Sequence, residues 1–514
     1  MKHASSKLLL VFTGAFIFTL LFWNEKMGVN AIIFDVFVCI GVFILYPSCR
    51  SNKISRWLFL AQTVTLAMIV IQNTILSKIA YAVTLLLFVS FSEFVHQSVF
   101  FAGGSIITNY VVAIPNVLIE LANMGGNRIH VYGWIRRFRL FIIPLAILSV
   151  FFVIYSSANV VFSNMFTAFL DRISSWFSNI FSWFSFERIG FFFLGAFIVA
   201  GILIKSRTSW FSDKDMNCHN DLSRKKNRLK KWRETGFADL LQLIIGRAAI
   251  GNLALKIEYR IATASILLLN ILLAVINVLD IRYVWLGYGM DENTQLSAYV
   301  HEGAGLLILS ILLAMFVLLF FFRGNINFYK QNKWLKYGAY LWLLQNTFLV
   351  LSVFCRDYYY ISRLGLAYKR IGLLFFLVMV LAGLISIFLK IYFKKTVYFL
   401  LRVNGWVAVV LLVISASANW DVAIASYNLQ HKATITPDVR FLLSLSDDVL
   451  PVLQKNEEVF QKAASGNTHY FFNNQYRNPL DYFNYRKEQF IIKQKQYSWL
   501  SWNVADASVL KELE

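Results

Sequence analysis

The sequence predicts an all-α protein, a polytopic transmembrane helical bundle of about 11 spans with a small α-rich extracytoplasmic C-terminal domain. Three observations predict this class. Of 514 residues, 58% are hydrophobic and 15% are charged, against about 45–50% and about 25% in ordinary soluble domains. Eleven apolar stretches approach the roughly 20 residues that a helix needs to cross a bilayer. Lys and Arg gather on alternate connections between these stretches, as the positive-inside rule describes.

The expected spans fill the chain from near its start to about residue 417. The first follows a short polar segment but has no small-residue cleavage site, which favours a retained helix over a signal peptide. Four cysteines without paired spacing predict neither a disulfide framework nor a metal site. The eleven spans are 8–23, 31–46, 57–76, 79–96, 141–162, 190–204, 261–279, 304–322, 335–354, 371–389 and 403–417.

Basic residues predict the orientation. With the N-terminus inside, the inner segments hold 30 Lys and Arg, the outer connections 9 and the C-terminal tail 10. An excess of this size predicts a cytoplasmic N-terminus, and an odd number of spans then places the C-terminus outside. We therefore expect the cytoplasmic (inner) membrane of a bacterium, with the lipid bilayer as the first partner.

Two amphipathic stretches complicate the count. Residues 105–124 carry apolar residues at helical spacing, and we expect an interfacial or re-entrant helix bent near Pro115. A twelfth span is the alternative, and it would reverse the orientation of everything that follows. Residues 163–186 are apolar on one side and rich in Ser on the other. They predict a helix lying in the outer interface.

Four regions follow from this pattern: a first helical group (1–204), a basic cytoplasmic connection (205–260), a second helical group (261–427) and a soluble extracytoplasmic domain (428–514). In the last region we expect a helix after Asp438 that Pro451 ends or bends. The stripe that predicts this helix comprises Phe441, Leu442, Leu445, Val449 and Leu453.

The densest charge cluster lies in the basic connection. Juxtamembrane cations gain about 1 kcal/mol each against anionic lipid, so we expect a patch that binds anionic lipids on the cytoplasmic side. No stacking aromatics or recognised module accompany it, and we expect no nucleic-acid partner. The patch comprises Arg224, Lys225, Lys226, Arg228, Lys230, Lys231 and Arg233.

Asp35, Glu93 and His96 are candidate intramembrane polar residues. Ionisable groups inside a bilayer are costly and are functional candidates by default. His96 follows Glu93 by one helical turn, a spacing that could hold a metal, but bundle metal sites need a second such motif on another helix. The sequence has none. We therefore expect no metal and no cofactor.

A second candidate site lies on the outer face of the second helical group. Four cations there, among them Arg356, Arg363 and Arg370, break the positive-inside trend and need anionic partners. An ion-paired interface and a cleft for an anionic ligand are the alternatives. One hypothesis pairs Asp421 with Arg363 or Arg370, which would dock the tail on the bundle. The candidate outer-face cluster comprises Asp291, Glu292, His301, Glu302, Arg356, Tyr360, Arg363, Arg370, Asn419 and Asp421.

Four motifs occur in order in the second half: YISRLGLAYKR from Tyr360, NWDVAIASYNL from Asn419, DVRFLLSLSDDVLPVL from Asp438 and WLSWN from Trp499. Over roughly residues 250–514 the chain resembles a bacterial inner-membrane family, the domain of unknown function numbered forty-one seventy-three, and its relatives. This resemblance implies a polytopic membrane protein and brings no activity or cofactor.

No complete catalytic motif is present in the sequence. We expect a non-catalytic sensor, scaffold or binding protein that works at the extracytoplasmic face and contacts another envelope protein through its C-terminal domain. The first alternative is a transporter or channel for an ion or small polar solute, which would use Asp35, Glu93 or His96. The second is a membrane enzyme acting on a lipid or glycan, with His301, Glu302 and Asp421 as its candidate residues.

Overall fold

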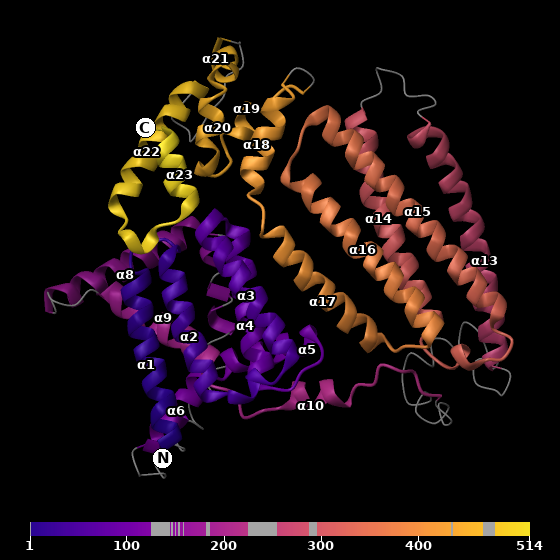
Figure 1. The fold of residues 1–514 in the computed structure, drawn as a ribbon, viewed down its shortest axis with the longest axis horizontal. Coiled ribbons are helices and arrows are strands. Elements are labelled where there is room, and N and C mark those ends of the chain that lie inside the picture. Colours follow the sequence, from indigo (N-terminus) through magenta and orange to yellow (C-terminus); the bar gives the residue numbers. More distant parts are fainter. Residues whose placement is uncertain are drawn as a thin grey trace.

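The computed structural model describes residues 2–124, 144–180 (without 145–146, 150, 153–154 and 158), 186–224, 254–286, 296–432, 435–465 and 478–513. Within these ranges the secondary structure is helical apart from one isolated bridge between Asp221 and Lys395. Figure 1 shows two groups of long helices and a smaller group of short helices above them. The N-terminus and the C-terminal segment lie at opposite ends of the long helices.

The first helical group has a continuous apolar core in which α2, α4 and α9 contribute most of the buried residues. Its helices begin where side chains cap free N–H groups: Asn52 caps α3 and Thr74 caps α4. The long helices are α1 (Lys2–Phe22), α2 (Val29–Leu45), α3 (Lys53–Gln72), α4 (Ile75–Glu93) and α9 (Phe186–Leu203).

The segment expected to be interfacial or re-entrant forms two helices, α5 (Val99–Val111) and α6 (Ala113–Met124), bent by 54° relative to each other. Pro115 has no N–H to give to the carbonyl of Val111, which explains a break near this point. Both pieces lie toward the end of the group where the N-terminus is found (Figure 1). The bend near Pro115 is confirmed; a broken span and a re-entrant loop both fit it.

The second expected interfacial helix is α8 (Val160–Ile180). Figure 1 shows it extending sideways from the top of α1 and α9, across the direction of those helices. Phe162, Met165, Phe169 and Leu170 on its described part are exposed apolar residues. An amphipathic helix in this position can bury such a face in the bilayer interface.

The second helical group packs around α15, which contacts α13, α14 and α16. Its core is formed mainly by Leu, Ile and Val from these four helices. Gln345 Nε2 of α15 donates to Asn270 Oδ1 of α13 at 2.8 Å, a hydrogen bond between helices that lipid could not supply. The helices are α13 (Ala254–Asp280), α14 (Leu296–Phe321), α15 (Lys333–Leu364), α16 (Tyr368–Phe393) and α17 (Val397–Ser415).

Two elements, α17 and α10 (Trp210–Asn217), join the two helical groups. Helix α17 packs on α16 and also contacts α3, α4 and α5 of the first group. The short helix α10 runs below both groups (Figure 1). Its Phe211 lies so close to Gly104 that a Cβ there would be 2.5 Å from the ring. Beyond α10, the chain pairs with the start of α17 through Asp221 and Lys395.

The C-terminal segment forms a group of short helices, called the C-terminal domain below, around a third apolar core that also includes Ile371 of α16. The helix expected over 438–453 is wrong as a continuous element, because it ends at Leu442 and restarts at Leu450. Pro451 lies in the first turn of the second piece instead of ending the first, a position where its missing N–H would be unbonded anyway. The elements are α18 (Trp420–Gln430), α19 (Val439–Leu442), η5 (Asp447–Val449), α20 (Leu450–Gln454), α21 (Glu457–Ser465), α22 (Pro479–Gln496), η6 (Trp499–Ser501) and α23 (Val504–Leu513).

Six described helices are long and apolar enough to cross a membrane, or seven if the bent pair α5 and α6 is one span. These six are α3, α4, α13, α15, α16 and α17, and shorter apolar stretches lie in α1, α2 and α14. Nine of the 22 residues of the expected span 141–162 lie outside the described residues. The class of helical membrane protein is confirmed, and the count of eleven stays a prediction.

Candidate functional site

The C-terminal domain touches the first helical group at the connection between α1 and α2. Gly28 lies against the backbone of η6, where a Cβ would be 2.5 Å from the carbonyl oxygen of Trp502. The N–H of Val29 donates to that same oxygen at 3.1 Å. Lys26 pairs with Asp506 at 3.1 Å, and its N–H donates to Ser501 Oγ at 2.8 Å. We call this contact the first-group joint.

The same domain touches the second helical group where α15 ends. Gly365 has a φ of +82°, and a Cβ there would lie 2.4 Å from Asn428 Oδ1. Both the backbone conformation and the lack of space therefore favour glycine at this position. Asn428 accepts from the N–H of Leu366 at 2.6 Å and donates to its carbonyl at 2.9 Å. Ile371 of α16 belongs to the core of the domain. We call this contact the second-group joint.

Three carboxylates gather beside the first-group joint. Burial, with the neighbouring Asp506 and Asp421, raises the pKa of Asp448 to about 6, although a hydrogen bond from Asn419 and the charge of Lys26 oppose the rise. The bond from Asn419 Nδ2 to Asp448 Oδ2 is 2.7 Å. The domain therefore meets the bundle through a partly buried acidic cluster whose charge changes near pH 6.

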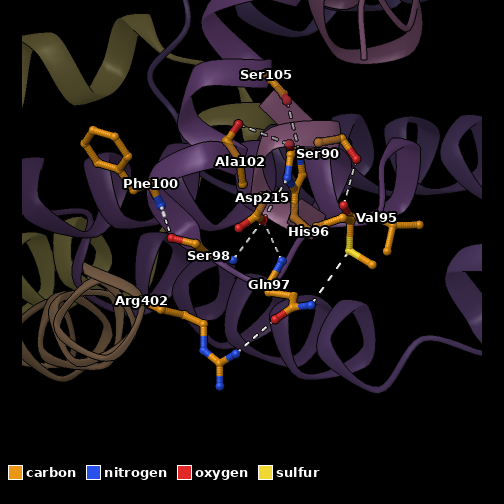
Figure 2. Close-up of polar contacts among 12 residues, drawn as sticks. Ser90, Val95, His96, Gln97, Ser98, Phe100, Ala102, Ser105, Asp215 and Arg402 are labelled. Atoms are coloured by element: carbon orange, nitrogen blue, oxygen red, sulfur yellow. Dashed lines mark hydrogen bonds and ion pairs between the residues drawn. The ribbon is translucent and has the colours of Figure 1, made fainter. Parts of the chain in front are cut away.

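A third joint lies at the opposite end of the helices, around Asp215 of α10 (Figure 2). Its Oδ2 accepts from the N–H groups of Gln97 (2.7 Å) and Ser98 (3.1 Å) at the start of α5 and lies 3.2 Å from His96 Nδ1. Its Oδ1 accepts from the hydroxyl of Tyr398 on α17 at 2.5 Å. Burial alone would raise the pKa of Asp215, but these four hydrogen bonds outweigh it and lower the pKa below its usual value.

The other ring nitrogen of His96 lies 3.0 Å from Ser105 Oγ, so Ser105, His96 and Asp215 are arranged like a Ser–His–Asp triad. The side chains of His96 and Asp215 have no exposed surface, and Ser105 is buried as well. The arrangement acts as a polar joint that fastens α10 and α17 to the first group.

Glu93 and His96, which the sequence placed one helical turn apart, do not lie on one helix in the structure. Helix α4 ends at Glu93, because Phe94 is extended with φ −126° and ψ 156°. His96 therefore does not lie on the same helical face as Glu93. The expectation that it follows Glu93 by one helical turn is wrong. Glu93 accepts from Asn109 Nδ2 at 2.5 Å, and the carbonyl of Glu93 accepts from Lys205 Nζ.

Asp35 lies in the middle of the first group. Its Oδ1 accepts from Gln62 at 2.5 Å and from Tyr81 at 2.8 Å, and Cys39 lies 3.6 Å from its Oδ2. This network ties α2 to α3 and α4. In the part of the chain that the structure describes, no group of three or more His, Cys, Asp or Glu side chains could hold a metal ion.

The described members of the expected outer-face cluster bond to several different partners. Arg356 pairs with Asp280, and both side chains are about 8% exposed; Ser352 also donates to Asp280, at 2.6 Å. Arg370 donates to the carbonyls of Leu364 and Gly365, and its guanidinium lies 4.2 Å from the Tyr360 ring. These contacts cap the ends of α13 and α15.

The hypothesis that Asp421 pairs with Arg363 or Arg370 is wrong. Asp421 accepts from the N–H of Ser446 at 3.0 Å inside the C-terminal domain, and Arg363 is exposed. Asn419 caps α18 through the N–H of Val422. The contact between the tail and the second group is made instead by Asn428, whose side-chain amide forms two hydrogen bonds with the backbone of Leu366. The sequence analysis did not single out Asn428.

Several residues of the expected outer-face cluster and of the basic patch lie outside the described residues. Asp291 and Glu292 lie outside the described residues, and His301 and Glu302 lie on the first turns of α14. Of the basic patch, Arg224 is described and exposed, and the other members lie outside the described residues: Lys225, Lys226, Arg228, Lys230, Lys231 and Arg233. The lipid-binding role of the patch stays a prediction.

The helices and their joints define a helical membrane protein, with several helices able to cross a bilayer. The chain belongs to the family described as "Domain of unknown function (DUF4153)", whose model matches residues 32–456. The family inferred from the sequence was also a domain of unknown function, but it had a different family number. The family match extends beyond the resemblance and covers most of the first helical group. The WLSWN motif lies beyond the matched residues. No curated protein and no solved structure matches the chain.

Proposed function

We propose that this protein is a non-catalytic scaffold of a bacterial inner membrane, with its N-terminus inside and its C-terminal domain at the extracytoplasmic face. The domain acts as a clamp that holds the two helical groups together and offers a surface to an envelope component. One observation carries the proposal: the C-terminal helices pack around one core and contact both groups, at Gly28 and at Gly365. The opposite positions of the N-terminus and the domain support the orientation.

The contacts explain how such a clamp would transmit a signal. A ligand that shifts the domain would act on both joints, because α23, which carries Asp506, and α18, which carries Asn428, pack in one core. Coupling of this kind needs an element that both sites bias. Trp499 and Trp502 next to the first-group joint are 69% and 51% exposed. Aromatic side chains of this kind suit a membrane interface or a protein partner.

Cysteine crosslinking tests the clamp. Gln72 Nε2 of α3 lies 2.7 Å from the carbonyl of Ser417, just after α17, so these positions report how the groups meet at the outer end. We would place Gln72→Cys and Ser417→Cys in a chain whose four native cysteines are replaced. We expect efficient disulfide formation, and a fall to less than about half when Lys26→Ala and Gly28→Leu weaken the first-group joint.

The matched control is a pair within one group. Thr65 of α3 and Thr84 of α4 are 2.9 Å apart, and crosslinking of Thr65→Cys with Thr84→Cys should not change in the same weakened chain. Equal crosslinking between the groups with and without an intact first-group joint would show that the domain does not hold them together.

A further inference from the structure

A cavity of about 670 Å³ lies where the two helical groups meet. Its walls come from the start of α3, the link between α4 and α5, and one face of α17. Its volume is within the range of about 300–1,000 Å³ that is usual for small-molecule sites. The lining residues are Ile54, Gln97, Arg402, Val403, Trp406, Val407, Val410 and Leu411.

The cavity is polar at one end and apolar along the rest. On α17 the lining begins at Arg402, near the start of the helix, and ends at Leu411. At 1.5 Å per residue, these nine steps span about 13 Å. Arg402 and Gln97 are the polar groups at the first end, and the side chains beyond Trp406 are aliphatic. This polarity matches a molecule with a charged head and a hydrocarbon chain.

Arg402 is held in place by a neutral partner. Its Nη1 donates to Gln97 Oε1 at 3.0 Å (Figure 2), and Trp406 donates to the Gln97 carbonyl at 3.2 Å. No carboxylate within the described ranges forms an ion pair with Arg402. The guanidinium has five N–H donors in a planar fork that suits phosphate. Its positive charge is therefore available to an anionic group.

More positive charge lies at the same end of the cavity. Lys53 and Arg56 are exposed on the first turn of α3, beside Ile54. Trp57 follows, 71% exposed, as aromatic residues at the level of lipid headgroups often are. A soluble anion would need only the charged end. An anionic lipid uses both the charge and the apolar wall.

We propose that this cavity binds one anionic glycerophospholipid from the leaflet on the N-terminal side. The phosphate lies at Arg402, within reach of the positive field of Lys53 and Arg56. One acyl chain lies along Val403, Val407 and Leu411, in the seam between α3 and α17. The bound lipid fills the space between the two helical groups at the end opposite to the C-terminal domain.

Native mass spectrometry of the full chain tests this proposal. The protein is purified in detergent, and palmitoyl-oleoyl phosphatidylglycerol or phosphatidylcholine is added in increasing amounts. We expect one phosphatidylglycerol to be retained per chain at low lipid concentration and phosphatidylcholine to be retained less. Arg402→Gln should weaken retention about tenfold, as expected for loss of a charge-assisted hydrogen bond. Arg207→Gln, at an exposed arginine between α9 and α10, is the charge control and should bind normally.

A second variant keeps the charge and removes the space. Val407→Trp should also abolish the one-to-one complex, whereas Leu401→Trp, on an exposed face of α17 away from the lining, should not. Retention that is unchanged in both Arg402→Gln and Val407→Trp would overturn the proposal. Equal loss in the Leu401→Trp control, or no one-to-one lipid on the unaltered chain, would also overturn it.

Discussion

Asp448 and Asp447 are neighbours in η5, yet the structure predicts opposite effects of neutralising them. Asp447 pairs with Arg486 at 2.5 Å, and its side chain is 41% exposed. Asp448 has no cationic partner at ion-pair distance among the described residues and lies beside Asp421 and Asp506, where burial raises its pKa to about 6. Asp448→Asn should therefore stabilise the docked domain at neutral pH, and Asp447→Asn should destabilise it.

The magnitude follows from the pKa of Asp448. A rise from 3.8 to about 6 corresponds to about 3 kcal/mol at 1.36 kcal/mol per pH unit. Because the carboxyl is only partly buried, we expect about 2 kcal/mol in a measurement. The folded protein binds more protons than the unfolded chain between about pH 4 and pH 6. The contribution of Asp448 to stability is therefore most favourable below pH 4, falls as the pH rises to about 6 and is level above that.

Amide hydrogen exchange of the full chain in detergent measures this effect. At pH 7, Asp448→Asn should slow exchange in α20 and α23 about thirtyfold, the factor that about 2 kcal/mol gives. The difference should shrink to about threefold near pH 4.5 and vanish below about pH 3, after correction for the intrinsic exchange rates. Asp447→Asn should instead speed exchange at pH 7 by about fivefold or more, because an exposed ion pair contributes up to about 1 kcal/mol and the Arg486 side chain in this pair is only 11% exposed. Equal or faster exchange in Asp448→Asn at pH 7 would refute the reasoning.

Three further predictions concern the joints and the orientation. Gly28→Ala forces a Cβ against the tail backbone, and it should expose the C-terminal domain to protease, whereas Gly103→Ala, with open space around it, should not. Gly365→Ala should lower the free energy of unfolding by at least about 1 kcal/mol, because φ is +82° and Asn428 Oδ1 lies 2.4 Å from the Cβ position. Thermal unfolding would measure this change, and an unchanged midpoint temperature would contradict the prediction. Ser508→Cys, in a chain without other cysteines, should react with an impermeant thiol reagent in intact spheroplasts; labelling only after lysis would reverse the proposed orientation.

The sequence alone predicted which segments are helices and that they belong in a membrane. Span length and apolar composition are local properties, and a helix satisfies its backbone hydrogen bonds within its own segment. The bend near Pro115 was also readable, because a missing N–H acts on the turn that contains it. The predicted continuous helix over 438–453 failed because side-chain spacing does not show where tertiary contacts interrupt a helix.

What the sequence by itself determined is the class of the protein and the positions of its long apolar helices. The pairing of polar groups was decided only by the tertiary structure, because the partners are far apart in the chain: His96 meets Asp215 across 119 residues, and Leu366 meets Asn428 across 62. Buried polar groups must find a partner wherever the packing provides one. Spacing along the chain carries no information about such partners, which is why Asp421 was assigned to the wrong contact and Asn428 was overlooked.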